Sequence, residues 1–223
     1  INSVENIKKH IFRGDIYEVN FCQEFYAFQT IDPFHTFLSL TEKSPSPFSS
    51  FLKIYEKYLL SSSPERFLKK KGNLLISQPI KGTIRRSDKR EEDTQLRKSL
   101  ETNTKERSEN IMIVDLVRND LSRIAKKGTV KVDELCKIYT FPQVHQMIST
   151  ISAECNSSSF KEILKATFPM GSMTGAPKIE ALKIIEKYER VKRGLYSGSV
   201  GYLNPSGDFD FNVVIRSIQY NAD

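Results

Sequence analysis

One stretch stands at the centre of the predicted fold, Gln78-Pro79-Ile80-Lys81-Gly82-Thr83. It ends an aliphatic run that starts at Leu74, and such a run closed by proline and glycine is typical of a β-strand. Lys81 lies where the backbone leaves this strand. Its amine becomes a nucleophile if burial or a neighbouring cation favours the neutral form. The alternative is a lysine that extends to solvent at a strand end, and the stretch alone favours that alternative.

The composition predicts one large globular domain. The chain has 223 residues, of which 39% are hydrophobic and 27% charged, so it can bury a sizeable core. No apolar run is long enough to span a bilayer, and nothing resembles a signal peptide. Three widely spaced cysteines, Cys22, Cys136 and Cys155, form neither a metal-binding pattern nor a disulfide framework. We therefore expect a cytoplasmic protein that makes no membrane contact.

The net charge of +7 has three interpretations. A solvated basic surface is favoured, and a site that attracts a small anion comes next. Nucleic-acid binding is least favoured, because the lysine clusters lack interleaved aromatic residues and no nucleic-acid motif is present. We expect no nucleic-acid partner.

Helical and strand patterns follow one another without a regular strand–helix–strand rhythm, which indicates an α+β fold. Helices are predicted to start at Ser3, Pro33 and Ser159, to follow Gly175-Ala176-Pro177, and to occupy most of Glu91–Lys126. The predicted strands are Ile16–Phe28, Phe48–Ile54, Tyr58–Ser62, Arg66–Lys70, Leu74–Thr83, Thr129–Val132, Gln143–Ser152, Tyr196–Leu203 and Phe209–Tyr220.

Glu65 lies in a polar break between two predicted strands. A carboxyl group held at such a break is a general acid if a dry pocket raises its pKa. The alternative is a surface glutamate paired with Arg66, and the local sequence favours it.

The run Glu109–Asp120 is apolar enough to be buried, yet it carries several charges. Buried charges need partners or a metal, and carboxylates without a Cys/His cluster suit Mg²⁺. We expect Asp115, Arg118 and Asp120 to form ion pairs. We expect Glu109, which shares a helix face with Glu106, to be a Mg²⁺ ligand.

Two further features could bind an anion. Phe168–Lys178 is a glycine-containing loop predicted to run into a helix, whose free N–H groups favour a carboxylate. The alternative is a turn that needs glycine only for its backbone angles. Arg216 lies in the alternating strand Phe209–Tyr220, on one face with Asn212 and Val214, where it could grip a carboxylate. The alternative is an exposed sheet face.

Together these segments resemble the chorismate-utilising enzymes. Seven motifs occur in the family's order: Gly14–Asn20, Ser63–Phe67, Pro79–Thr83, Glu109–Asp120, Gly171–Lys178, Gly194–Tyr202 and Ile215–Ser217. Within the family the sequence is most similar to the aminodeoxychorismate synthases, component I. Lys81 stands where anthranilate synthases generally have alanine, and Asn110 where they typically have histidine.

The resemblance implies two orthogonally packed antiparallel β-sheets with helices on the outside. It implies that residues 1–223 are a chorismate-binding catalytic domain without the family's N-terminal region and final strand and helix. It implies Mg²⁺ bound by Glu109, and amination of chorismate at C4 with ammonia from a glutamine amidotransferase subunit. Lys81 would attack C2 while Glu65 assists the departure of the C4 hydroxyl. The implied substrate-binding residues are Thr83, Gly171, Ser172, Tyr196 and Arg216.

Two alternatives remain at this point. Within the enzymes, the protein could be an anthranilate synthase component I, which makes a different product from chorismate. From another class, it could be a noncatalytic module that binds anions or nucleic acid.

Overall fold

The computed structural model describes residues 2–155 and 159–222. The helices are α1 (Asn2–Arg13), α2 (Pro33–Lys43), α3 (Arg90–Thr102), α4 (Thr104–Ser122), α5 (Phe160–Thr167), α6 (Lys178–Tyr188) and the 3₁₀ turn η1 (Gly171–Met173). The strands are β1 (Glu18–Val19), β2 (Phe48–Ile54), β3 (Lys57–Ser63), β4 (Arg66–Lys71), β5 (Leu74–Gln78), β6 (Ile80–Arg85), β7 (Lys131–Thr140), β8 (Val144–Glu154), β9 (Gly175–Ala176), β10 (Gly201–Leu203), β11 (Phe209–Asn212) and β12 (Ser217–Asn221).

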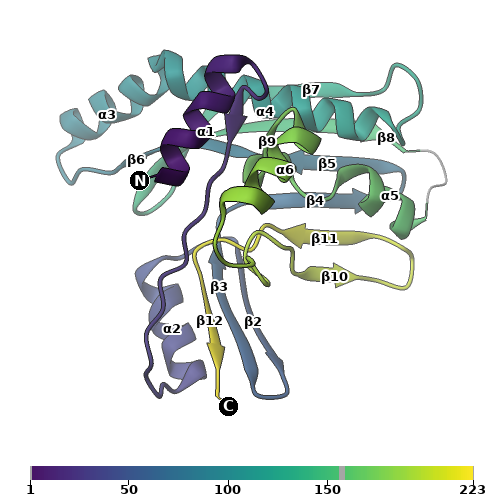
Figure 1. Ribbon diagram of the computed structural model, residues 1–223. Helices are drawn as coiled ribbons and strands as arrows, with labels where there is room; N and C mark the ends of the chain where they lie inside the picture. The colour runs from purple at the N-terminus through teal and green to yellow at the C-terminus, as the bar shows by residue number, and fades with distance from the viewer. Residues whose placement is uncertain (1, 156–158, 223) are drawn as a thin grey trace.

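The strands form two main sheets whose pairings are all antiparallel. The larger has the order β10-β11-β4-β5-β8-β6, with β7 also pairing with β8, and the smaller has the order β12-β3-β2. The strands of the smaller sheet run across the direction of the strands in the larger sheet (Figure 1). The α+β fold predicted from the sequence is confirmed. A third, two-stranded ladder joins β1 to β9.

Helix α4 covers the larger sheet and builds the main core. Its apolar face, which includes Ile113 and Leu121, is buried in one cluster with Leu75 of β5 and Ile151 of β8. Each fully buried aliphatic residue of this kind contributes about 1.5–3 kcal/mol. Within the described part of the protein, no helix has the length and apolar character that a membrane crossing needs.

Three charged residues of α4 form ion pairs, as expected. On its solvent face Arg118 and Asp115 lie 2.7 Å apart. On its inner face Asp120 is buried and binds Lys178 of α6. The prediction of ion pairs for these three α4 residues is therefore confirmed, and α4 presents its charges to partners rather than to an apolar core.

Local signals predicted several elements correctly. Asp32 caps α2 by accepting the His35 N–H at 2.8 Å, and Pro33 is the first helical residue. Ser159 and Glu162 form a reciprocal capping box at the start of α5. The hairpin of β2 and β3 has the predicted position.

The predicted strand Ile16–Phe28 is wrong over most of its length. Only Glu18 and Val19 form a ladder, with Ala176 and Gly175 of β9. The backbone then runs as a long loop to α2 (Figure 1), and Phe25 and Phe28 are 88% and 95% exposed. Alternation gives the direction of side chains, but a strand also needs a neighbour for its N–H and C=O groups.

The predicted strand Phe209–Tyr220 is divided between the two sheets. β11 pairs with β4 of the larger sheet, and β12 pairs with β3 of the smaller one. Val213 and Val214 are both buried, so the alternation is broken at the junction. Arg216 has a φ of 49° there and does not lie in a strand, which corrects the predicted placement.

Other strand limits differ as well. Leu74–Thr83 is divided at Pro79, and its two parts, β5 and β6, pair one after the other with β8. β7 extends eight residues beyond the predicted Val132, and β10 begins only at Gly201. The loop after α5 contains η1 and β9 and then leads into α6, which begins at Lys178, so the predicted loop running into a helix is confirmed.

Candidate active site

A bulge in β6 sets the direction of Lys81. The pairing with β8 shifts between Ile80 and Thr83, and Gly82 has a φ of 94°. A Cβ atom on Gly82 would lie 3.3 Å from side-chain atoms of Glu106 and Leu100. Glycine therefore meets both requirements of this position, a positive φ and a close approach of the helices. Bulges of this kind re-aim a side chain, and this one directs Lys81 away from bulk water.

Lys81 is paired rather than solvated. Its Nζ lies 2.8 Å from Oε1 of Glu18, and the side chains of both residues are only 16% exposed. The second oxygen of Glu18 is buried without a hydrogen-bond partner among the described residues. Asn110 of α4 donates to the backbone carbonyl oxygen of Lys81 at 3.4 Å. The alternative of a lysine extending to solvent is thus wrong.

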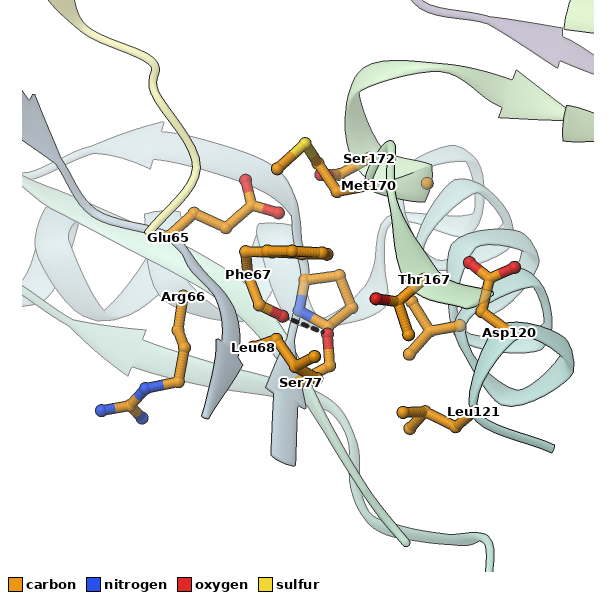
Figure 2. A pocket seen from close by; sticks show the side chains of 13 residues that line it. Glu65, Arg66, Phe67, Leu68, Ser77, Asp120, Leu121, Thr167, Met170 and Ser172 are labelled. Carbon is orange, nitrogen blue, oxygen red and sulfur yellow. Dashed lines mark hydrogen bonds between the residues drawn. The ribbon is translucent and has the colours of Figure 1, made fainter. Parts of the chain in front are cut away.

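Glu65 occupies the break between β3 and β4, where it is 3% exposed. Burial raises its pKa to about 7, although the nearby Ser172 hydroxyl, the Ile80 N–H and the Lys81 ammonium all favour the ionised form. Arg66 points away (Figure 2) and binds Asp210, with an Nε–Oδ1 distance of 2.8 Å. The alternative that paired Glu65 with Arg66 is therefore wrong.

Glu65 lines a narrow cavity of about 20 Å³ together with Gly171 and Ser172 (Figure 2). This volume is enough for about one water molecule. A Cβ atom on Gly171 would lie 2.8 Å from Leu116, so glycine lets η1 pack against α4. The Ser172 hydroxyl is buried near the Glu65 carboxyl but lacks the geometry of a hydrogen bond to any described residue. The cavity thus brings together the Glu65 carboxyl, whose raised pKa lets it carry a proton near neutral pH, and the unpartnered Ser172 hydroxyl.

Asp120 also lines this cavity, and it binds Lys178 of α6. Burial raises the pKa of Asp120 and lowers the pKa of Lys178, while each favours the charged form of the other. Lys178 also donates to the backbone carbonyl oxygen of Thr167 at 3.3 Å. This pair connects α4 to α6.

Thr83 and Arg216 lie in a second group around Gln146 of β8. Gln146 Nε2 is 3.5 Å from the Thr83 hydroxyl. Gln146 and Arg216 line a small pocket together with Pro64, the residue before Glu65. Arg216 is exposed and makes no ion pair with any residue that the structure describes. Its guanidinium is therefore available to a ligand in this small pocket.

Tyr196 faces a different and larger cavity of about 550 Å³, which Cys22 and Arg193 also line. Burial raises the pKa of Tyr196. Arg193 joins this cavity to the Ser172 loop, because its guanidinium donates to Met173 O at 2.6 Å and to Asn20 O at 2.8 Å. The structure therefore groups Lys81, Glu65, Gly171 and Ser172, and places Tyr196 apart from them.

Glu109 can supply one ligand to a metal ion. Its side chain is 30% exposed and lies 3.5 Å from Lys105. Within residues 2–155 and 159–222, no three His, Cys, Asp or Glu residues form a ready-made metal site. Mg²⁺ usually keeps several waters and takes one or two carboxylates together with substrate oxygens. Glu109 fits the role of such a single protein ligand.

Sequence reasoning missed Glu18 and Arg193. Both act through contacts between residues far apart in the sequence, Glu18 with Lys81 and Arg193 with Asn20. The one available signal was the polar face of the segment after Gly14, where Glu18 and Asn20 alternate with apolar residues.

Comparison with known proteins gives consistent relatives. The chain is 40% identical over 213 residues to aminodeoxychorismate synthase component 1 of Escherichia coli. The matched region covers 95% of this chain and 47% of that protein. It is 42% identical over 228 residues to a chloroplastic aminodeoxychorismate synthase of Arabidopsis thaliana, covering 100% of this chain and 25% of that protein. The chain thus spans half or less of the length of these relatives.

The fold has a close counterpart among solved structures. A crystal structure of anthranilate synthase component I from Streptococcus pneumoniae matches with a TM-score of 0.90 at 32% identity, over 99% of this chain and 49% of that one. The sequence also matches the family described as chorismate binding enzyme over residues 1–223. With this fold and these relatives, the chain belongs to the chorismate binding enzyme family.

Proposed function

We propose that this chain is the catalytic domain of an enzyme that aminates chorismate at C4, giving 4-amino-4-deoxychorismate for 4-aminobenzoate and folate synthesis. Relatives named aminodeoxychorismate synthase support this activity. The observation that carries it is Lys81, which is withdrawn from solvent and held beside Glu18 and Glu65. A glutamine amidotransferase partner supplies the ammonia, and the enzyme works in the cytoplasm.

The reaction divides one displacement into two. The Lys81 amine bonds to C2, each ring double bond shifts by one position, and the bond from C4 to its hydroxyl oxygen breaks. Glu65 gives its proton to that oxygen, which leaves as water. Ammonia then bonds to C4, the double bonds shift back, and the Lys81 amine leaves C2. An amine nucleophile lowers the barrier by making two easier steps out of one. With a pKa of about 7, Glu65 is a suitable acid at neutral pH.

The substrate carries two carboxylates, and the protein offers free polar groups to meet them. Arg216 holds the carboxylate of the enolpyruvyl group through its planar fork. The unpartnered Ser172 hydroxyl donates to the substrate, whereas Tyr196, which lines the separate larger cavity, makes no contact with the ring in this proposal. Thr83 and Gly171 complete the contacts around the ring.

Glu109 holds Mg²⁺ in this proposal. When bound, the ion neutralises the ring carboxylate of chorismate. Calorimetry on the full-length protein tests this ligand. Mg²⁺ binding should be lost in Glu109→Gln and retained in Asp115→Asn, which alters an exposed carboxylate of the same helix. Equal binding in both variants would remove Glu109 from the site.

A covalent adduct tests the role of Lys81. We expect the full-length protein, given chorismate and Mg²⁺ without ammonia, to gain the mass of chorismate minus water. Peptide mapping should place this mass on the Ile80–Thr83 segment. Lys81→Ala should lose the adduct, whereas Lys161→Ala, which alters an exposed lysine of α5, should retain it. Absence of the adduct in the wild type, with normal amination by Lys81→Ala at low ammonium, would contradict the proposal.

Anthranilate synthesis is the second candidate, because the fold matches an anthranilate synthase component I so closely. The products separate the two. Chromatography of a reaction with chorismate and ammonium should show aminodeoxychorismate, and release of anthranilate would favour the second candidate.

A further inference from the structure

We propose, resting on the function above, that Glu18 is the positioning residue that takes the proton from Lys81 and returns it. The two groups already share a hydrogen bond of 2.8 Å between Nζ and Oε1. The other Glu18 oxygen is buried and has no partner among the described residues. A carboxylate this close and this little solvated can receive a proton directly.

The backbone of Glu18 is fixed for this purpose. β1 lies against β9, with the Tyr17 N–H donating to Ala176 O and the Asn20 N–H to Thr174 O, both at 2.7 Å. Gly175 has a φ of 149°, and a Cβ atom there would lie 2.1 Å from the Glu18 carbonyl oxygen. Only glycine permits this approach. The short ladder therefore holds the carboxylate opposite Lys81 of β6.

The pairing also defines a chemical requirement. An ammonium has no lone pair, so Lys81 cannot attack C2 while the ion pair persists. Transfer of one proton from Nζ to Oε1 leaves a neutral amine and a neutral carboxylic acid. The amine forms the bond to C2, and when it later leaves C2 it recovers its proton from Glu18. The proton on the departing C4 hydroxyl comes from Glu65, so the two acids serve different atoms.

Other charged groups face this pair. Glu65 approaches from the break between β3 and β4, and Glu106 of α4 lies against Gly82. Both remain in a Glu18 variant, so a ratio of rates between variant and wild type cancels their ionisation. The pH dependence of that ratio therefore reports only on the proton transfer between Glu18 and Lys81.

The test is the pH profile of adduct formation in single turnover. In the wild type the internal transfer conserves the number of bound protons, so the pair itself adds no pH dependence. In Glu18→Gln the amine must lose its proton to solvent. We expect the variant-to-wild-type rate ratio to rise about tenfold per pH unit between about pH 6 and pH 8. Glu18→Asp retains the carboxylate and should keep a nearly constant ratio.

A ratio that stays constant with pH in Glu18→Gln would overturn the inference, since a merely structural loss lowers the rate equally at every pH. Glu180→Gln, which removes an exposed carboxylate from α6, is the control for a lost charge. If the wild type forms no adduct and Lys81→Ala aminates normally at low ammonium, the proposed function of Lys81 fails, and acetic anhydride labelling without substrate decides the Glu18 question. Faster acetylation of Lys81 at pH 7 in Glu18→Gln than in the wild type supports the coupling, and an unchanged rate overturns it.

Discussion

Glu65 and Asp120 line the same narrow cavity, on opposite sides in Figure 2, but their surroundings differ. Burial raises the pKa of both. Asp120 is bound by Lys178, whose ammonium also bonds to Thr167 O. Glu65 forms no ion pair with any residue that the structure describes, and its pKa reaches about 7. One carboxylate is thus committed to holding two helices together, and the other keeps a proton that it can give away.

This difference indicates how charged residues that stabilise the fold can be told from charged residues that are available for binding or catalysis. A charge whose hydrogen bonds are all used within the fold stabilises that fold. A buried or half-buried group with unused capacity, such as Glu65 or the Ser172 hydroxyl, is available to a ligand. Three experiments can break or sharpen this distinction.

The largest effect is expected from Lys178→Ala, because it leaves Asp120 buried without its cation. The free energy of unfolding should fall by about 3–5 kcal/mol. Urea denaturation measures it. Replacing both partners, as Asp120→Leu with Lys178→Met, should cost less than the single change. The distinction fails if Lys178→Ala lowers the free energy of unfolding no more than Lys183→Ala, which removes an exposed ion pair from the same helix.

A smaller effect is expected from the protonation of Glu65. Its pKa is about 7 in the folded protein and 4.5 in a model peptide, so the folded state binds this proton more tightly than the unfolded one. The stabilisation is complete below about pH 4.5 and is lost as the pH rises through about 7. The loss amounts to about 3 kcal/mol. Glu65→Gln should remove this contribution, as unfolding at pH 5 and pH 8 would reveal. An identical pH dependence in variant and wild type would mean that Glu65 is not held protonated.

The smallest effect concerns two arginines that repeat the contrast. Arg193 is bound by Glu189 and two backbone oxygens, whereas Arg216 makes no ion pair within the described residues. We expect Arg216→Lys to raise the Michaelis constant for chorismate about tenfold, since lysine lacks the bidentate fork. Arg193→Lys should chiefly lower the melting temperature. Steady-state kinetics and thermal unfolding distinguish these outcomes, and equal Michaelis constants for Arg216→Lys and the wild type would exclude the proposed contact.

The sequence predicted what depends on neighbours along the backbone. Asp32 and Ser159 cap helices through residues three positions away, and Asp115 and Arg118 pair within one turn. For Glu65 and Lys81 the local sequence favoured surface positions, and only the order of motifs along the whole chain indicated a role for them. These features rest on short spacings, for which local rules are strong.

The remainder depends on contacts that local patterns do not encode. Glu18 meets Lys81 only because β1 is held by β9, which lies far along the sequence. Alternation continued smoothly through Arg216 although the hydrogen-bonding partners change there from one sheet to the other. The sequence pattern specifies faces, and the partner strand is decided by tertiary packing.

The division of residues 209–221 between two sheets has a mechanical consequence. The backbone passes from one sheet to the other at two places, from β3 to β4 through Glu65 and from β11 to β12 through Arg216. Two backbone hydrogen bonds connect these crossings. The Val213 N–H donates to Glu65 O at 3.0 Å, and the Ser62 N–H donates to Arg216 O at 3.1 Å. The acid and the arginine therefore lie on two backbone segments that are hydrogen-bonded to each other, so a shift of one segment is passed directly to the other.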